Sequence, residues 1–228
     1  MRLAILLFFA LLICGVSYTE AYSDEGSSRH SPANPTDTTA GAEYLTEIER
    51  QIIIEINLVR TNQAEYARLF LVPLRSYYHN GLLQFPGEIP ISTKEGIRAL
   101  DECIKELQAA KKPLAPLYPQ KGLTLAARDH AKDLAKTGEI GHTGSDGSTI
   151  ETRLNRYGKW GLSAGENIDY GNGEAKRIVA SLLIDDGVPS RGHRKNLLNG
   201  SFKFVGVAVE THRIYRHLCV MDFAGSYR

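Results

Sequence analysis

The order of two apolar periodicities is the feature that most constrains this chain. Through most of its length, apolar residues recur every three or four positions, which is the spacing of an amphipathic helix. Clear alternation comes late, in residues 204–210 (FVGVAVE) and 215–223 (YRHLCVMDF), which predict an antiparallel hairpin. Helices therefore precede strands without βαβ alternation. This order predicts an α+β fold, in which helices pack on an antiparallel sheet.

The individual elements follow from the same patterns. Residues 162–170 predict a further strand, residues 79–91 a loop, and residues 64–78 an apolar segment that kinks or breaks at Pro73. The first predicted helix begins near Thr46. Further helices are predicted over residues 92–110, 122–137, 148–156, 174–184 and 190–198.

Capping boxes support three of the predicted helix starts. In this motif a Ser or Thr side chain and a Glu three residues later satisfy the first free N–H groups of a helix. The pairs with this spacing are Thr46 with Glu49, Ser92 with Glu95, and Ser148 with Glu151.

The first residues of the chain have the pattern of an export signal. After Arg2, residues 3–16 (LAILLFFALLICGV) form an apolar run that is too short for a membrane span and suits a signal peptide. Cleavage is predicted near Ala21, so residues 1–21 are the predicted signal. Residues 22–43, rich in Ser, Thr, Pro and Gly, are a predicted disordered linker. We therefore expect a secreted protein, extracellular or periplasmic, without a membrane span after signal removal.

Composition excludes several classes of protein. Of the 228 residues, 43% are apolar and 23% charged, which is typical of a globular domain and not of a collagen or coiled coil. The net charge of +1, without a long basic run, argues against nucleic-acid binding. Export leads to an oxidising compartment, where Cys103 and Cys219 either form one disulfide or remain separate buried thiols.

Three glycine-flanked segments carry residues capable of chemistry. They are residues 141–148 (GHTGSDGS), 165–168 (GENI) and 191–198 (RGHRKNLL). Together they supply two imidazoles and one carboxylate, from His142, His193 and Glu166. Such a set can hold a divalent ion, carry out acid–base chemistry, or form a neutral hydrogen-bonded network. His130, on the apolar stripe of a helix, is predicted to be a packed structural residue.

In this order, the three segments resemble the CAP superfamily of cysteine-rich secretory proteins, antigen 5 and pathogenesis-related 1 proteins. Residues 55–60 (EINLVR), Gly206 in a strand, and the final MDFAG also fit. The resemblance covers roughly residues 44–228, with a helical insertion near 76–115. Because the cysteine framework of animal and plant members is absent, the chain is most similar to the short-motif microbial branch.

The resemblance implies an α-β-α sandwich with a central antiparallel sheet and a large surface cleft. It also implies a tetrad of two histidines and two acidic residues in the cleft, where some members hold a divalent metal, often zinc. By match, His142, His193 and Glu166 are three of the four residues and the implied metal ligands. No motif match gives the fourth: the helix before His193 offers Glu174, Asp185 and Asp186, of which we take Asp185 or Asp186 as the candidates.

From this resemblance we expect a secreted protein that uses its cleft to bind a ligand, with no established catalysis. The ligand is a lipid or sterol, an extracellular protein partner, or a divalent metal. The alternative is a metal-assisted hydrolase, in which His142 and His193 hold the ion and Glu166 is the base that activates water. A third hypothesis is a purely structural secreted module.

Overall fold

Residues 36–228 are described by the structure, which is a computed structural model. The predicted signal peptide, residues 1–21, and residues 22–35 of the predicted linker lie outside the described residues. The last part of that linker, residues 36–43, packs on the domain instead of being disordered, and Ala42 is buried in the core.

Asn57 explains why this segment is ordered. It is fully buried on α1 (Glu47–Thr61), and its amide donates to the carbonyls of Thr36 at 3.0 Å and Leu117 at 3.1 Å. Its side-chain oxygen accepts from the Leu117 N–H at 2.7 Å. A buried amide needs such partners, and they attach the chain before α1 to the domain. The folded part therefore begins before residue 44, the boundary expected from composition.

The strands predicted from the sequence form the central sheet. β5 (Trp160–Tyr170), β6 (Phe204–His212) and β7 (Arg216–Tyr227) pair antiparallel, with β7 in the middle. A two-residue strand not anticipated from the sequence, β4 (Tyr118–Pro119), adds to β6 in parallel. In the resulting order, β4-β6-β7-β5, strand β5 lies at an edge.

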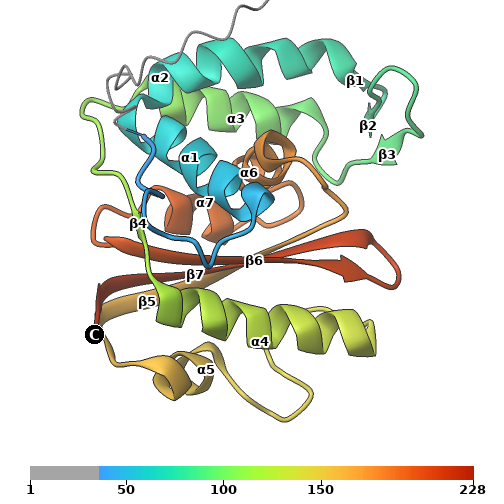
Figure 1. The fold of residues 1–228 in the computed structure, drawn as a ribbon. Coiled ribbons are helices and arrows are strands. Elements are labelled where there is room, and N and C mark those ends of the chain that lie inside the picture. The colour runs from blue at the N-terminus through green and yellow to red at the C-terminus, as the bar shows by residue number, and fades with distance from the viewer. Residues whose placement is uncertain (1–35) are drawn as a thin grey trace, which may run out of the picture. The chain divides into compact units, whose positions relative to one another are not determined.

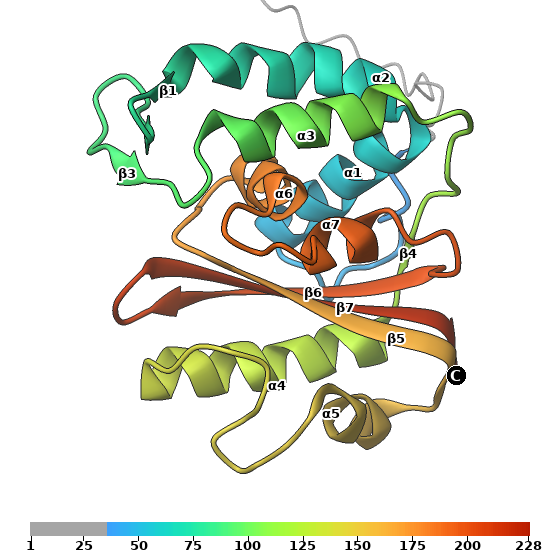
Figure 2. The same ribbon diagram turned by 180° about the vertical axis from the view of Figure 1, so that it is seen from behind.

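Helices cover both faces of this sheet, as Figures 1 and 2 show from opposite sides. One face carries α1, α3 (Ile97–Gln108), α6 (Ala175–Ile184) and α7 (Gly192–Leu197). The other carries α4 (Lys121–Thr137) and α5 (Ile150–Tyr157). The predicted α-β-α sandwich is confirmed. None of the helices within residues 36–228 is long and apolar enough to cross a membrane.

The apolar segment that contains Pro73 is irregular, as predicted. It begins with α2 (Gln63–Tyr66), continues as a π-helical turn (Ala67–Leu71), and ends as a 3-10 helix (Val72–Tyr77). Proline has no N–H to donate to the preceding turn, so a regular α-helix cannot pass through it.

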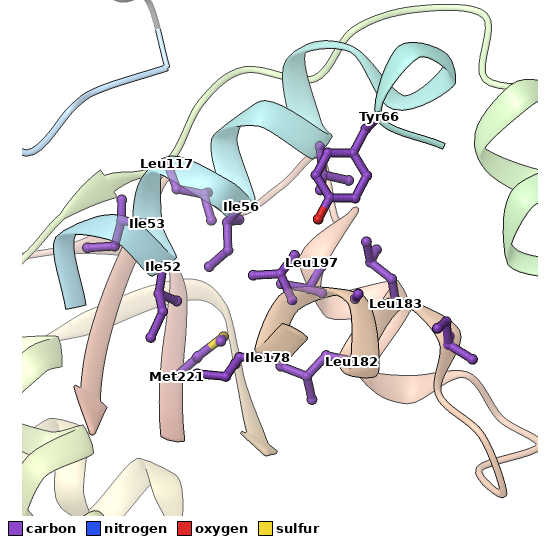
Figure 3. Packing of buried hydrophobic residues seen from close by; sticks show 14 of the residues in the cluster. Ile52, Ile53, Ile56, Tyr66, Leu117, Ile178, Leu182, Leu183, Leu197 and Met221 are labelled. Atoms are coloured by element: carbon purple, nitrogen blue, oxygen red, sulfur yellow. The ribbon is translucent and has the colours of Figure 1, made fainter. Parts of the chain in front are cut away.

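Alternation along the strands divides the core into layers. In β7, Met221 and Phe223 face the layer of α1 and α6, whereas Leu218 and Val220 face α4. Figure 3 shows Met221 among isoleucines of α1 and leucines of α6. Cys103 and Cys219 are both buried in the layer of α1 and α6 as free thiols. Of the two predicted alternatives, a disulfide or separate thiols, the structure therefore has separate thiols.

Only one of the three predicted capping boxes is present. Thr46 and Glu49 cap α1 reciprocally, and the Thr46 N–H donates to Glu49 Oε2 at 2.8 Å. The boxes predicted at Ser92 and Ser148 are wrong, because α3 and α5 begin later along the chain. Glu95 instead bonds to an arginine side chain of the α6–α7 loop, which sequence spacing cannot reveal.

The segment predicted as a loop contains a small sheet. β1 (Tyr78–His79), β2 (Leu82–Leu83) and β3 (Ile91–Ser92) pair antiparallel, and we call residues 78–92 the β1–β3 sheet. α3 follows it, so the predicted helical insertion holds both a sheet and a helix.

At Gly206 the backbone of β6 packs directly against the backbone of α4. A Cβ at this position would lie 2.1 Å from the carbonyl carbon of Leu123 and 2.2 Å from the Thr124 nitrogen. Backbone atoms inside a helix cannot move aside cheaply, so we expect Gly206→Ala to lower the free energy of unfolding by about 2–3 kcal/mol. Urea unfolding measures this. Gly200→Ala is the control, because its new methyl would meet only a Leu114 side chain at 3.5 Å. Equal stability of the two variants would contradict the close contact.

Candidate functional site

The structure pairs each predicted histidine with a carboxylate, and the two carboxylates differ. His142 Nδ1 lies 2.8 Å from Glu166 Oε1, and His193 Nδ1 lies 2.7 Å from Asp185 Oδ1. Since an ionised carboxylate only accepts hydrogen bonds, each Nδ1 is the donor. In the neutral ring, each Nε2 then carries a lone pair. Of the two candidates for the fourth residue, Asp185 is the one that pairs with a histidine.

Asp186, the other candidate, has a different role. Its carboxylate accepts from the backbone N–H groups of Lys94 at 2.6 Å and Glu95 at 2.7 Å. These bonds attach the segment after the β1–β3 sheet to the loop between α6 and α7. Asp186 is therefore an anchor for the insertion.

Glu166 is the centre of the first pair. Its side chain is buried on β5, and its second oxygen accepts from Arg153 Nη2 at 2.7 Å. The buried Arg153 also donates to the backbone carbonyl of His142 at 3.1 Å, which holds the histidine loop against the sheet. Burial by itself raises the pKa of Glu166, but the His142 bond and the Arg153 charge outweigh it and hold the pKa below its usual value.

His130 is a buried neighbour of the His142–Glu166 pair. It is fully buried, and its Nε2 donates to the Gly141 carbonyl at 2.9 Å, which confirms its prediction as a packed, hydrogen-bonded residue. The same nitrogen lies 4.0 Å from Glu166 Oε1. Burial lowers the pKa of His130, so the ring tends to stay neutral.

The second pair forms at a tight junction between two helices. Asp185 ends α6 in the left-handed region, with φ of 57°. Its Oδ2 accepts the backbone N–H of His193 at 2.9 Å, while its Oδ1 accepts the ring N–H. One carboxylate thus orients both the backbone and the side chain of His193.

Two asparagines connect this junction to β5. Asn167 Nδ2 donates to the His193 carbonyl at 3.0 Å, and Asn196 Nδ2 donates to Asn167 Oδ1 at 2.8 Å. The same Asn196 amide also lies 3.3 Å from the Glu166 carbonyl. Both pairs are therefore attached to consecutive residues of one strand. These asparagines stand in the GENI and GHRKNLL motifs, but their roles were not anticipated.

Two arginines of the third motif attach α7 to the insertion. Arg191 bonds to Glu95 and Glu102, at distances between 2.6 and 3.1 Å. The fully buried Arg194 bonds to Glu102 at 3.0 Å and Glu106 at 2.7 Å. The insertion thus supports the helix that carries His193.

Asp222 is a buried carboxyl that was not anticipated. It lies directly opposite Glu166 on β7, it is fully buried, and neither of its oxygens has a donor among the described residues. Burial and the negative charge of Glu166 raise its pKa well above the usual value. The raised pKa favours the neutral form of Asp222, whereas the lowered pKa of Glu166 favours its ionised form. A charge at an inward position between Val220 and Ala224 was the available signal.

The histidines have only part of what a metal site needs. A carboxylate on Nδ1 and a free Nε2 are typical of zinc-binding histidines. Within residues 36–228, however, no three His, Cys, Asp or Glu side chains converge as a protein-held zinc ion requires. The described residues therefore do not fit such an ion, and we derive no step through one. Zinc binding by His142, His193 and Glu166 stays a prediction.

Comparison with known proteins identifies the class to which this fold and site belong. Residues 55–223, most of the chain, match the model of the cysteine-rich secretory protein family, CAP. The chain belongs to this family, and the resemblance inferred from the three motifs is confirmed.

Individual relatives are more distant. The protein YkwD of Bacillus subtilis (strain 168) is 28% identical over 128 residues, which are 54% of this chain and 48% of YkwD. The chain thus spans about half the length of that relative. An extracellular protein containing an SCP domain from Bacillus anthracis is 28% identical over 49% of this chain and 34% of its own, with a TM-score of 0.41. An outer surface protein from Borrelia burgdorferi is 24% identical over 56% of this chain and 89% of its own, with a TM-score of 0.42.

The acid pair leads to a prediction about pH. The pKa of Asp222 is higher in the folded chain than in the unfolded chain, where it is about 3.9. Protonated Asp222 therefore contributes its full share to the free energy of unfolding below about pH 3.9. This share is lost as the pH rises through the pKa of the folded chain. Asparagine binds no proton. We therefore expect Asp222→Asn to gain stability over the native chain between pH 5 and 8, at up to about 1.4 kcal/mol per pH unit.

Urea unfolding across this range measures the difference. Asp169, another buried carboxyl, titrates in the same way in the native chain and in Asp222→Asn. Its effect therefore cancels in the difference between their free energies of unfolding. A difference that stays constant from pH 5 to 8 would show that Asp222 is ionised in the folded state.

The donor set leads to a second prediction. Because no three donors converge among the described residues, we expect zinc titrated by calorimetry to bind weakly, with a Kd above about 1 μM. The double variant His142→Ala/His193→Ala is the control. Binding far tighter than this, abolished in the control, would contradict our interpretation and support the metal assignment.

Proposed function

We propose that this protein is an exported CAP-domain protein that binds an apolar small molecule, a lipid or sterol, in a pocket beside the His193–Asp185 pair. The observation that carries the proposal is a cavity of about 530 Å³. Ligand pockets in proteins fall between about 300 and 1,000 Å³ and are lined mostly by apolar side chains.

Apart from the α6–α7 junction described below, three parts of the chain line this pocket. The β1–β3 sheet and the segment before it contribute Phe70, Leu83 and Ile91, and the α6 helix contributes Leu182. The end of β5 contributes Ile168. Most of the lining is thus apolar, and much of it comes from the insertion, so the pocket depends on a part of this chain outside the three motifs.

The polar part of the lining includes only one of the two histidine pairs. His193 and Asp185 line the pocket, whereas His142 and Glu166 are not among its lining residues. The cavity that supports our proposal therefore involves the second pair, and a cleft lined by both histidines stays a prediction. The first pair, with Arg153 and Asp222 around it, supports β5 from the opposite face of the sheet.

Export is the part of this proposal that rests on the sequence. The apolar run of residues 3–16 precedes the described residues and suits a signal peptide. The alternative of a metal-assisted hydrolase is less well supported, because its mechanism needs an ion that the described donor set does not fit.

Two isoleucines of the insertion provide the test. Ile91 lines the pocket and is 53% exposed, whereas Ile89 is 88% exposed and is not a lining residue. Ile91→Asp places a charge against the ligand, so we expect binding of an NBD-labelled sterol or NBD-labelled dodecanol to weaken by about tenfold or more.

Ile89→Asp adds the same charge two residues away and should bind as the native chain does. Fluorescence titration measures both. If the native chain binds neither probe, or if both variants bind like it, the pocket is not a ligand site.

A further inference from the structure

The buried polar wall of the pocket, formed by Asp169, Asp185 and His193, carries an inference about the ligand. Asp169 lies near the end of β5 and is 4% exposed. Its two oxygens each lie 3.0 Å from Asn172 Nδ2. Asp169 takes part in none of the ion pairs formed among residues 36–228, so no cation neutralises it there. Ser181 and the Asn172 backbone also donate to it, so Asp169 is hydrogen-bonded but carries a buried charge that no described cation neutralises.

His193 offers a second acceptor in the same wall. Its Nδ1 donates to Asp185, so the neutral ring presents an unprotonated Nε2, and its side chain is 23% exposed. Asp185 itself is occupied, because its two oxygens hold the ring and the backbone N–H of His193. His193 Nε2 is thus the acceptor in this wall that has no partner among the described residues.

The other charged groups that line the pocket are exposed or already partnered. Arg177 forms two bonds to Glu88, at 2.8 and 2.7 Å. The Lys176 ammonium lies 4.1 Å from the centre of the Phe70 ring, and the Glu174 side chain is 75% exposed. Asp186, which also lines the pocket, accepts from two backbone N–H groups. The polar wall therefore differs from its surroundings in holding a buried carboxyl without a cationic partner, Asp169, beside the unprotonated Nε2 of His193.

We infer that the ligand is an amphiphile whose polar end donates hydrogen bonds, an alcohol or an amine, rather than a carboxylate. This inference rests on the proposed function and names the ligand class for the same pocket. A hydroxyl or ammonium reaches Asp169 and His193 Nε2 as a donor. A ligand carboxylate would bring a second negative charge into a buried space beside Asp169, which is costly.

The charge of Asp169 distinguishes the two kinds of donor. Burial raises its pKa to about 7, an effect that the Asn172 and Ser181 hydrogen bonds and the nearby His193 only partly offset. Its cross-strand neighbour Cys219 stays a neutral thiol, because burial raises that pKa as well. An ammonium should therefore bind more tightly as the pH rises from 6 to 8.

Probes with one chain length and three polar ends test the inference. Dodecan-1-ol, dodecylamine and dodecanoate compete at pH 7 with NBD-labelled dodecanol for the chain without residues 1–21. We expect the alcohol and the amine to displace the probe at concentrations about tenfold below that of dodecanoate. If the three compete equally, or dodecanoate competes best, the inference is wrong while the proposed function stands. If neither NBD-labelled dodecanol nor the NBD-labelled sterol binds, both are wrong; if only the sterol binds, it serves as the displaced probe in the same competition.

A matched pair of variants assigns the preference to one carboxyl. Asp169→Asn keeps the shape and an acceptor for Asn172, and we expect it to weaken dodecylamine binding by about tenfold and to remove its pH dependence. Glu174→Gln removes an exposed carboxylate at the same pocket and should leave the order of the three probes unchanged. Equal effects of the two variants on dodecylamine would show that general charge, and not Asp169, selects the ligand, and would overturn the inference.

Discussion

The antiparallel pairing of β5 with β7 is the constraint on which the arrangement of polar groups depends. Alternation along β5 sends Glu166 toward α4 and α5, and the next residue, Asn167, toward α7. A shift of register by one residue would exchange the two sets of contacts. Because β5 is an edge strand, both faces of its polar segment are within reach of loops. One strand can therefore contact His142 from one face and the His193 segment from the other. In this way the motifs that contain the two histidines are both attached to the GENI motif of β5.

Buried carboxyl groups divide into two kinds in this molecule. Glu166 and Asp185 are ion-paired and hydrogen-bonded, and they orient His142 and His193. Asp222 and Asp169 have no cationic partner among the described ion pairs, and burial raises the pKa of both. An unneutralised buried carboxyl is costly, and such groups concentrate at functional sites. Here one lies behind the Glu166 pair and the other in the pocket wall, so each histidine pair has a neighbouring acid that can gain or lose a proton.

The insertion does more than extend the surface. Its helix α3 supplies Glu102 and Glu106 to arginines beside His193, and its small sheet supplies part of the pocket lining. Asp186, in the loop between α6 and α7, holds the insertion by accepting hydrogen bonds from the backbone N–H groups of Lys94 and Glu95. The arginines of RGHRK, which look like surface charges in the sequence, are therefore structural, and the segment that shapes the pocket also holds the helix that carries its histidine. Ligand contact and site geometry are coupled through the same residues.

Local patterns in the sequence were sufficient for the α+β class, the terminal hairpin, the helices and the family. The same patterns gave His142, Glu166 and His193 as candidate site residues, because glycine-flanked motifs and apolar periodicity are properties of neighbouring residues. The partner of each side chain was decided only by the tertiary structure. Periodicity tells which face of a strand a residue occupies, but not what packs against that face. For that reason the choice of Asp185 over Asp186, the orientation of Asp222 toward Glu166, the failure of two capping boxes and the existence of the pocket all depended on contacts between segments far apart in the chain.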